Sequence, residues 1–424
     1  MFSAVFTVKL QLPDRPATVR EGPELAGRQW WMRPAQNVIL LLTLAWIVYY
    51  FAHGFEERAK GTDFSERYAA ARMVREGYGH QLYDFRVQEQ FQIRYAGRIG
   101  EYYIHPPFGT LLFLPIAFWS LRTAYLMWCL LNTGVLVYTA ILFQRHVFPG
   151  FDWRVMVPLF FLFPPVLIGF LQGQDSLLLL LIMTLAVVEL RRERNFSAGC
   201  WLGCGLFKFH IVLTLIVFLG SLRRKGLLSG FACVFGTLVL ISAGISGWAF
   251  LTEYPRFLMG LSRLPLANIH PAAMANIRGL VSVLGIAKDA VARLILIGIA
   301  SVWVLWRAWR PLSGSKSRGA ANLAFGNFVL AAILVSYHLS PSDLCIALLP
   351  IGLFSQYLAE HAGIPRWAQL TLLLSQGILF LPPLHLIALA WHLYVCLIIP
   401  ILVMFLLTSA EIFRGVASHG HQAV

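Results

Sequence analysis

The stretch GTDFSERYAAARMVREGYGHQLYD, residues 61–84, is a polar and charged segment in a chain that is otherwise mostly apolar. It begins a few residues after the first long apolar run, so Asp63 lies close to the expected membrane edge. A carboxylate held at the edge of a membrane is a candidate general base. The loop that contains this stretch is therefore the first place to look for chemistry.

Asp63 also has a purely structural interpretation. Asp63-Phe64-Ser65-Glu66 matches a helix capping box, and Phe64, Tyr68, Ala71 and Val74 then repeat at helical spacing as one apolar face. The two roles are compatible, because a cap fixes the orientation of a carboxylate at the start of a helix.

Composition places the chain among polytopic helical membrane proteins. Hydrophobic residues make up 58% of the 424 residues and charged residues 13%, and long apolar runs recur along the chain. No polar stretch exceeds about 55 residues, which leaves no room for a soluble catalytic domain. Any catalysis must therefore use membrane helices and their loops.

The charge pattern indicates topology rather than a nucleic-acid partner. The formal net charge is +14, but the basic residues gather at the ends of apolar runs, as in Arg191-Arg192-Glu193-Arg194. The first 35 residues are polar, and no small-residue cleavage site follows the first apolar run, so we expect an uncleaved first span with its N-terminus in the cytoplasm.

Several kinds of site are not expected. The cysteines all lie inside apolar segments without C-x-x-C spacing, which argues against disulfides and a zinc site. The chain has no D-x-D, no G-x-x-x-x-G-K-[ST], no H-E-x-x-H and no G-x-S-x-G. We expect neither a metal nor another cofactor.

Two apolar runs do not fit a simple crossing. The run 108–120 follows Pro106-Pro107, and its roughly 13 residues cannot cross a hydrocarbon core of about 30 Å, so we expect a re-entrant or interfacial helix. The run 197–222 is interrupted by Lys208 and has Arg-rich sequence at both ends. We expect two short helices that meet near Lys208, and one tilted helix over 197–222 is the alternative.

About twelve crossings result. They fall at residues 36–55, 122–144, 154–171, 175–190, 197–208, 210–222, 228–248, 289–308, 320–337, 342–358, 367–382 and 386–408.

This topology defines the domains. A cytoplasmic tail at 1–35 precedes a single transmembrane domain at 36–408, and a second cytoplasmic tail follows at 409–424. Large external loops are expected at 56–107 and 249–288, with external juxtamembrane helices in the first. Asp63 then shares the external face with Gln174, Lys208 and the turn 337–343.

Polar residues on that face are the candidate site. Lys208, beside His210 in an otherwise apolar run, could neutralise a lipid phosphate or could extend to the interface. Gln174 and Asp175 open a helix, where Asp175 could be an N-cap.

His338 could donate to a phosphate or a sugar hydroxyl, or could be a satisfied buried histidine, and Asp343 could cap a helix. Sugar or acceptor contacts are also expected from Tyr68 and His105. In the loop 249–288, donors for an anionic headgroup or a sugar are Arg263, His270 and Arg278, although interfacial anchoring explains each of them equally well.

These residues resemble glycosyltransferase family 87, whose members include polyprenol-phosphate-mannose-dependent α-1,2-mannosyltransferases of the GT-C membrane architecture. The resemblance covers roughly residues 36–360. It rests on an ordered succession of motifs: Asp63 with Tyr68-Ala69-Ala70-Ala71, Gly77, Leu82-Tyr83-Asp84, Pro106-Pro107, Gly173-Gln174, Gly199 to Gly203 before Lys208, and Ser336-Tyr337-His338 with Asp343.

The resemblance implies a GT-C fold in which Asp63 is the catalytic base, the donor is a sugar on a lipid phosphate, and Lys208 and His338 share one cavity. Two positions depart from the pattern, because family members often have Asn at position 175 and Tyr at position 105. Acceptor or sugar preference could differ accordingly.

We therefore expect an inverting transfer of one sugar, mannose by resemblance, from a polyprenyl-phosphate donor to a lipid-linked or glycan acceptor. The active site would face the extracytoplasmic side of the plasma (inner) membrane. Donor phosphate contacts are assigned to Lys208, His338, Arg278 and Arg263, and sugar or acceptor contacts to Gln174, Asp175, Tyr68, His105, His270 and Asp343. The rival functions are a glycolipid transporter or flippase and a lipid-linked polysaccharide polymerase or ligase. A transporter usually shows two related halves, and no second copy of the first loop is visible.

Overall fold

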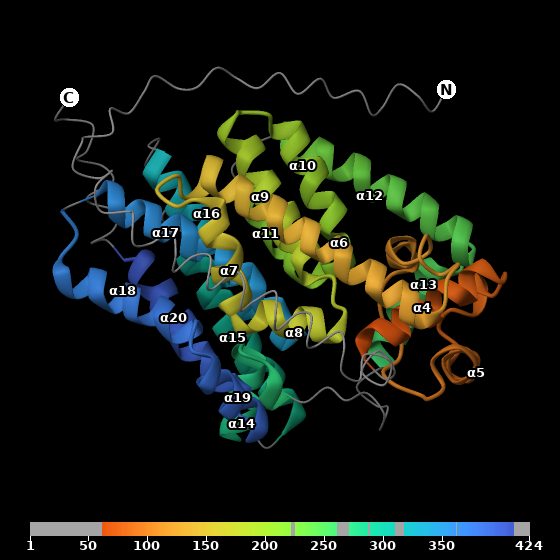
Figure 1. Ribbon diagram of the computed structural model, residues 1–424. Helices are drawn as coiled ribbons and strands as arrows, with labels where there is room; N and C mark the ends of the chain where they lie inside the picture. Colours follow the sequence, from red (N-terminus) through yellow and green to blue (C-terminus); the bar gives the residue numbers. More distant parts are fainter. Residues whose placement is uncertain are drawn as a thin grey trace. The chain divides into compact units, whose positions relative to one another are not determined.

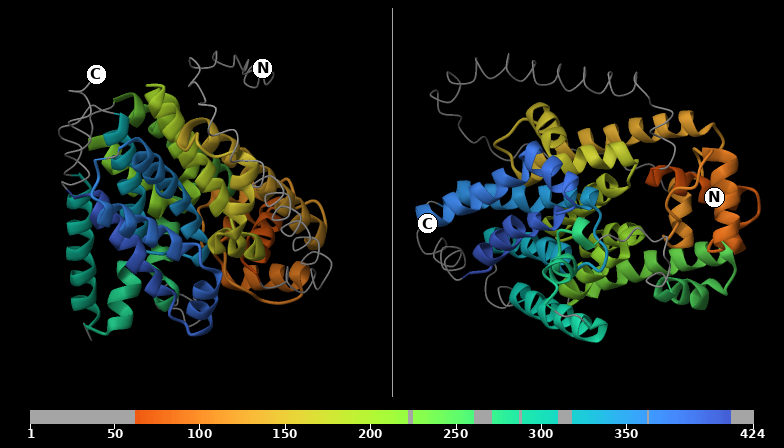
Figure 2. Two further views of the ribbon diagram at one scale, coloured as in Figure 1. Left: turned by 60° about the vertical axis from the view of Figure 1, so that its left-hand side comes forward. Right: turned by 90° about the horizontal axis from the view of Figure 1, so that it is seen from below.

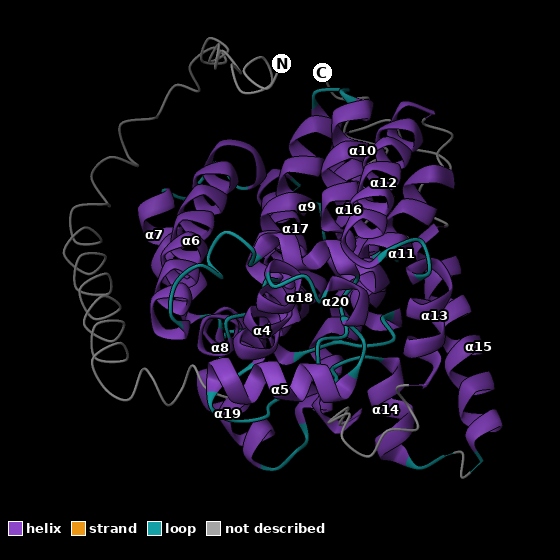
Figure 3. Cartoon of the chain, turned by 90° about the vertical axis from the view of Figure 1, so that its right-hand side faces the viewer, coloured by secondary structure: helices purple, strands orange, loops and turns teal. Residues whose placement is uncertain are grey.

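The computed structural model describes residues 62–221, 225–260, 271–286, 289–309, 318–361 and 363–410. Within these ranges the chain forms helices and loops and no strand (Figure 3). The α-helices are α4 (Asp63–Arg75), α5 (Phe85–Ala96), α6 (Leu121–Leu142), α7 (Trp153–Leu162), α8 (Pro164–Gln172), α9 (Ser176–Arg191), α10 (Asn195–Cys204), α11 (Phe209–Ser221), α12 (Lys225–Ser246), α13 (Phe250–Gly260), α14 (Ile277–Leu284), α15 (Ala290–Trp309), α16 (Arg318–Val335), α17 (Leu348–Glu360), α18 (Arg366–Leu379), α19 (Pro382–Ala390) and α20 (Ile398–Thr408) (Figure 1).

Short helical turns connect several of them. They are η1 (Gly79–Gln81), η2 (Pro107–Leu112), η3 (Phe143–Val147), η4 (Gly205–Lys208), η6 (Pro271–Ala273), η8 (Pro341–Ala347) and η9 (Tyr394–Leu397).

Several helices are long and apolar enough to cross a membrane. By length and composition, the described residues contain 5 such segments, or up to 7 if each of two bent helix pairs is one span. The all-helical membrane architecture is thus confirmed, whereas the first expected span, 36–55, lies outside the described residues. The count of twelve stays a prediction.

Two expected crossings are broken. The segment 154–171 consists of α7 and α8, which meet at an angle of 73° where Pro164 begins the second helix. The segments 367–382 and 386–408 were wrong in extent, since α18 and α19 meet at 59° and a turn with η9 separates α19 from α20. A proline near the start of each following helix explains the breaks.

The chain reverses direction at Lys208. If residues 195–221 formed one straight helix, Asn195 and Ser221 would lie about 39 Å apart. The chain from Ser221 to Lys225 can span at most about 14 Å, so it could not return to Asn195. Gly226 does lie beside Asn195, however, because a Cβ on Gly226 would be 3.4 Å from the Cβ of Asn195. Although composition alone counts 195–217 as one span, α10 and α11 must therefore run in opposite directions, as expected for a split pair.

Glycines bring α10 and α12 close together (Figure 1). A Cβ on Gly199 would lie 2.0 Å from the carbonyl oxygen of Leu227, and a Cβ on Gly230 would lie 2.0 Å from that of Phe196. Small residues at such contacts are typical of helix pairs in membranes. Cys200 also takes part in this contact, where its thiol donates to the carbonyl of Gly230 at 3.6 Å. All the cysteines are free thiols.

The expected helix over 108–120 was wrong. Only η2 is helical there, and turns follow it up to Ser120 because Pro115 interrupts the regular pattern of backbone hydrogen bonds. The helices expected in the first loop are present as α4 and α5. These helices, coloured orange, lie at the ends of α6 and α12 (Figure 2), where the hydroxyl of Ser246 donates to the carbonyl of Gly79 at 2.9 Å.

Candidate active site

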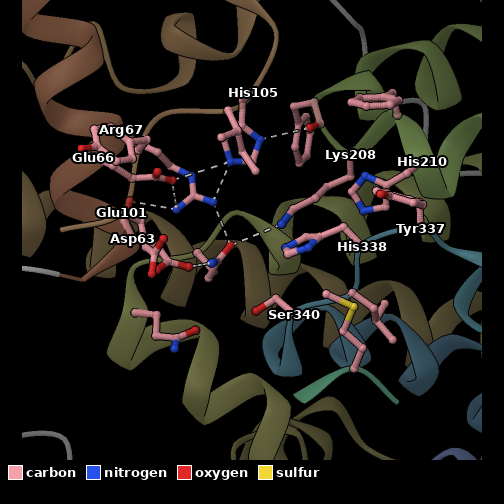
Figure 4. Close-up of a pocket in the computed structure, with 18 of the residues that line it drawn as sticks. Asp63, Glu66, Arg67, Glu101, His105, Lys208, His210, Tyr337, His338 and Ser340 are labelled. Atoms are coloured by element: carbon pink, nitrogen blue, oxygen red, sulfur yellow. Dashed lines mark hydrogen bonds and ion pairs between the residues drawn. The ribbon is translucent and has the colours of Figure 1, made fainter. Parts of the chain in front are cut away.

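A cavity of about 460 Å³ opens where the first loop meets the turns between membrane helices (Figure 4). Its polar lining comes from five separate parts of the chain. These residues are Asp63, Glu66 and Arg67 of α4, Glu101, Tyr102 and His105 of the loop before η2, Gln172 at the end of α8 with Gln174 after it, Lys208 and His210 at the chain reversal, and Tyr337, His338 and Ser340 before η8.

Asp63 is the first residue of α4 and lies partly exposed in the wall of the cavity. The expected capping box is wrong, because Thr62 is at the N-cap position and no side chain caps the helix. The carboxylate of Asp63 instead accepts a hydrogen bond from Nε2 of Gln174. It is therefore oriented by a residue 111 positions away in the chain.

Gly173 explains how Gln174 reaches Asp63. Its φ of 63° is in the left-handed region, and a Cβ there would lie 2.5 Å from the Cβ of Phe64. Only glycine allows this turn to pack so closely against α4. The sequence Gly173-Gln174 thus places an amide directly beside Asp63.

Arg67 is almost fully buried between these residues, with 2% of its surface exposed. Its Nη1 donates to the carbonyl of Asp63 at 2.9 Å, and its Nη2 lies 3.0 Å from both Oε1 of Gln174 and Nε2 of His105. Its Nε lies 3.7 Å from Asp175. Arg67, Glu66 and Glu101 were not predicted from the sequence to line the cavity. Helical spacing could have indicated Glu66 and Arg67, because residues three and four positions after Asp63 lie on the same face of the helix.

Lys208 lines the cavity with its charge already paired. Its Nζ lies 3.1 Å from Asp175, 2.9 Å from Asp343 and 3.3 Å from Oε1 of Gln174. An ammonium group has three N–H donors, and these contacts account for all of them. Lys208 therefore holds the turns together, and the phosphate contact expected of it stays a prediction.

The two aspartates lie behind Lys208 and do not line the cavity. Asp175 is at the N-cap position of α9, as expected, but its side chain makes no capping hydrogen bond. Asp343 accepts from the hydroxyl of Ser176 at 2.7 Å and from the backbone N–H of Ser340 at 2.9 Å, which confirms a capping contact in addition to its ion pair. The sugar or acceptor contacts expected of both carboxylates stay predictions.

His210 and His338 face each other beyond Lys208. Their ring centroids are 6.3 Å apart at an interplanar angle of 85°. Within the described part of the chain, Nε2 of His210 and Nδ1 of His338 are buried and have no hydrogen-bond partner. Both rings line the cavity, so each can present an N–H to an anion or a hydroxyl.

A family comparison decides the class of the chain. The model of glycosyltransferase family 87 matches residues 103–341, which is more than half of the chain. The chain belongs to glycosyltransferase family 87. It is therefore a membrane glycosyltransferase, and the GT-C architecture implied by the resemblance is consistent with its all-helical fold. No curated protein and no solved structure matches it.

The residues matched to family 87 include most of the cavity wall but not α4. His105, Gln174, Lys208 and His338 lie inside the matched range, whereas Asp63 precedes it. The structure joins the two parts, since the contact between Gln174 and Asp63 crosses the boundary of the match.

Other predicted residues of this family 87 protein lie outside the cavity wall. Tyr68 is buried in the apolar packing of α4, where its hydroxyl donates to the carbonyl of Trp119 at 2.6 Å, and the sugar contact expected of it stays a prediction. Arg278 donates to the carbonyl of Tyr337 at 2.8 Å and stacks on its ring, at the edge of the site. Arg263 and His270 lie outside the described residues.

Burial sets the protonation of the loop residues. It raises the pKa of Asp63 above its usual range, opposed by the charges of Arg67 and Lys208 and by the Gln174 hydrogen bond. It also raises the pKa of Glu66 well above its ordinary value. Burial lowers the pKa of His105 to about 3, with Arg67 acting in the same direction, and it lowers that of His338 to about 4. Both histidines are therefore neutral at pH 7. In the described ranges, no three His, Cys, Asp or Glu side chains come together as potential metal ligands.

Proposed function

We propose that this protein is an inverting glycosyltransferase that moves one sugar from a polyprenyl-phosphate donor to a lipid-linked or glycan acceptor. The sugar is mannose, as the resemblance to polyprenol-phosphate-mannose-dependent members of the family implies. The cavity faces the extracytoplasmic side of the plasma (inner) membrane, and both termini are cytoplasmic.

The observation that carries this proposal is the partly exposed carboxylate of Asp63, oriented by Gln174 in the wall of a cavity that His210 and His338 line beyond Lys208. In the proposed reaction Asp63 removes the proton from the acceptor hydroxyl as that oxygen attacks the anomeric carbon. The bond between the anomeric carbon and the phosphate oxygen breaks, and the polyprenyl phosphate leaves with the electron pair. This displacement inverts the configuration at the anomeric carbon.

The donor phosphate is placed near His210 and His338. Lys208 contributes its field, but its N–H groups are occupied by Asp175, Asp343 and Gln174. Both rings line the cavity, and an imidazole N–H that donates to the leaving phosphate stabilises its charge. The scheme uses no metal ion.

The test is transfer by the purified protein from labelled polyprenyl-phosphate-mannose to a membrane glycolipid, comparing wild type with Asp63→Asn. General-base assistance contributes about 10²- to 10⁴-fold, so we expect a loss of that size in the variant. Turnover retained within a few-fold would reject Asp63 as the base. Transfer that requires a nucleotide sugar would reject the lipid donor, and products extended by oligosaccharide blocks would indicate a polymerase.

A further inference from the structure

Arg67 is the residue that connects the base to the rest of the cavity wall. Its guanidinium contacts the backbone of Asp63, the side chain of Gln174, the ring of His105 and the carboxylate of Asp175.

The contacts of Arg67 decide which way the Gln174 amide points. Oxygen and nitrogen of a carboxamide are distinguished by their hydrogen-bond partners. Here Oε1 accepts from Arg67 at 3.0 Å and is 3.3 Å from the ammonium of Lys208, both of which can only donate. Nε2 must then face Asp63, to which it donates. A flipped amide would set its N–H groups against two cations.

This orientation assigns the two oxygens of Asp63. Oδ2 accepts from Gln174, which leaves Oδ1 to accept the proton from the acceptor hydroxyl. The carbonyl of Asp63 accepts a hydrogen bond from Nη1 of Arg67, so the same guanidinium fixes the backbone at the start of α4. One side chain thus holds the base through its backbone and through its amide partner.

We propose that Arg67 is the positioning residue of this site, which through the Gln174 amide holds the Asp63 carboxylate in the orientation that accepts the acceptor's proton. This inference rests on the proposed function, since it concerns the same base. It adds a residue outside the range matched to the family. Arg67 itself touches no reacting atom in this scheme.

The test separates the charge of Arg67 from its geometry. The charged and titratable groups that face Asp63 are Arg67 and Glu66 on its own helix, Asp175 at the start of α9 and Lys208 at the chain reversal. Arg67→Gln removes a charge that opposes the raised pKa of Asp63, so the acid limb of the pH profile of kcat should move to higher pH. Arg67→Lys keeps the charge but cannot make the same contacts. The acid limb of the pH profile of Arg67→Lys should therefore stay where it is in wild type, while its kcat falls.

Misplacing a catalytic group by about 1 Å can cost about 10²-fold, so we expect kcat to fall about 10- to 100-fold in both variants. The kcat of Gln174→Asn should fall by a similar factor. The kcat of the double variant Arg67→Gln/Gln174→Asn should be no lower than that of the poorer single variant, because both substitutions act through one contact. Arg72→Gln is the matched control, since Arg72 lies on the same helix and bonds to Tyr68 and Trp119 outside the cavity. It should keep kcat and the pH profile of wild type.

Three results would overturn the inference. These are an unshifted acid limb in Arg67→Gln, multiplicative losses in the double variant, or an equal shift in Arg72→Gln. Thermal unfolding of each variant in detergent shows whether a loss of kcat comes from loss of fold, and the pH profile of the remaining folded enzyme still decides. If wild type transfers no sugar from any lipid-phosphate donor, the proposed function fails, and this outcome is distinct from an active wild type whose Arg67 variants match it.

Discussion

The ammonium of Lys208 lies 2.9 Å from the carboxylate of Asp343, which joins the chain reversal between α10 and α11 to the start of η8. Both side chains are buried, with 4% and 0% of their surfaces exposed. The same ammonium contacts Asp175 at the start of α9. Three turns that form one end of the cavity are therefore held by one buried cation.

Removing Lys208 should destabilise the protein more than removing either carboxylate. Lys208→Met leaves Asp175 and Asp343 buried without their cation, and loss of one partner from a buried pair costs about 3–5 kcal/mol. Asp343→Asn keeps the pair with Asp175 and should cost less. The check is the order of the unfolding temperatures in detergent. An unfolding temperature for Lys208→Met at or above that of Asp343→Asn would contradict this role.

His105 should give the protein an acid-sensitive stability. Its pKa is lowered to about 3 in the folded state from 6.5, so between these values the unfolded chain binds more protons. Stability therefore falls as the pH decreases from about 6.5 towards 3. Asp63 and Glu66, whose pKa values are raised, act with the opposite sign.

The contribution of His105 is isolated by subtracting His105→Gln from wild type. We expect the difference in unfolding temperature to change with pH below about 6.5 and to be constant above it. A difference that is independent of pH from 4 to 8 would show that the ring is not held neutral. The activity profile of His105→Gln should keep its acid limb, because His105 does not titrate in that range.

Gly173→Ala should disrupt the site as well as the fold. The substitution forces a left-handed φ on alanine and places its Cβ 2.5 Å from Phe64, next to the base. We expect transfer activity to fall by about 10²-fold because Gln174 and Asp63 move apart. Gly97→Ala is the control, since Gly97 has a φ of 77° and no atom within 4 Å of its Cβ position.

The control Gly97→Ala should be destabilised only by the left-handed backbone conformation, by about 1–2 kcal/mol, and should keep the kcat of wild type. Equal kcat values for the two glycine variants would show that the close approach to Phe64 does not matter for the site.

Gly230→Ala should separate α10 from α12. Its Cβ would lie 2.0 Å from the carbonyl oxygen of Phe196, which is backbone and cannot move aside alone. Gly236→Ala on the same helix meets nothing within 4 Å and should stabilise by up to about 1 kcal/mol through helix propensity. The unfolding temperatures should therefore move in opposite directions. A shift of the same sign in both variants would contradict the close contact.

Much of the fold could be predicted from local patterns. The length of the apolar runs indicated membrane helices because a span needs a fixed number of apolar residues. Charge at both ends of 197–222 indicated the reversal at Lys208 because basic residues favour one side of the membrane. The breaks at Pro164 and after Leu379 were missed, since a run of apolar residues looks continuous whether or not the helix bends.

The candidate site was predicted less completely. Asp63, Gln174, Lys208 and His338 were correctly expected to come together, because the topology put them on one face. The helical spacing correctly placed Tyr68 on the apolar face of α4, but it could not reveal that the hydroxyl of Tyr68 donates to the carbonyl of Trp119. Arg67 was overlooked because a charged residue on a loop helix is usually solvated.

The sequence by itself determined the class of this protein, an all-helical membrane glycosyltransferase with a carboxylate at the start of its first loop helix. The length of the apolar runs and the order of the motifs are properties of the linear chain, so they can be recognised without knowing which residues are in contact. Only the tertiary structure decided what each charge does. Lys208 is neutralised by Asp175 and Asp343, which lie 33 and 135 positions away in the chain. Arg67 orients Asp63 through the amide of Gln174, which lies 107 positions after Arg67. Charge pairing in a buried site depends on distances of a few ångströms, and those distances are set by how the helices pack.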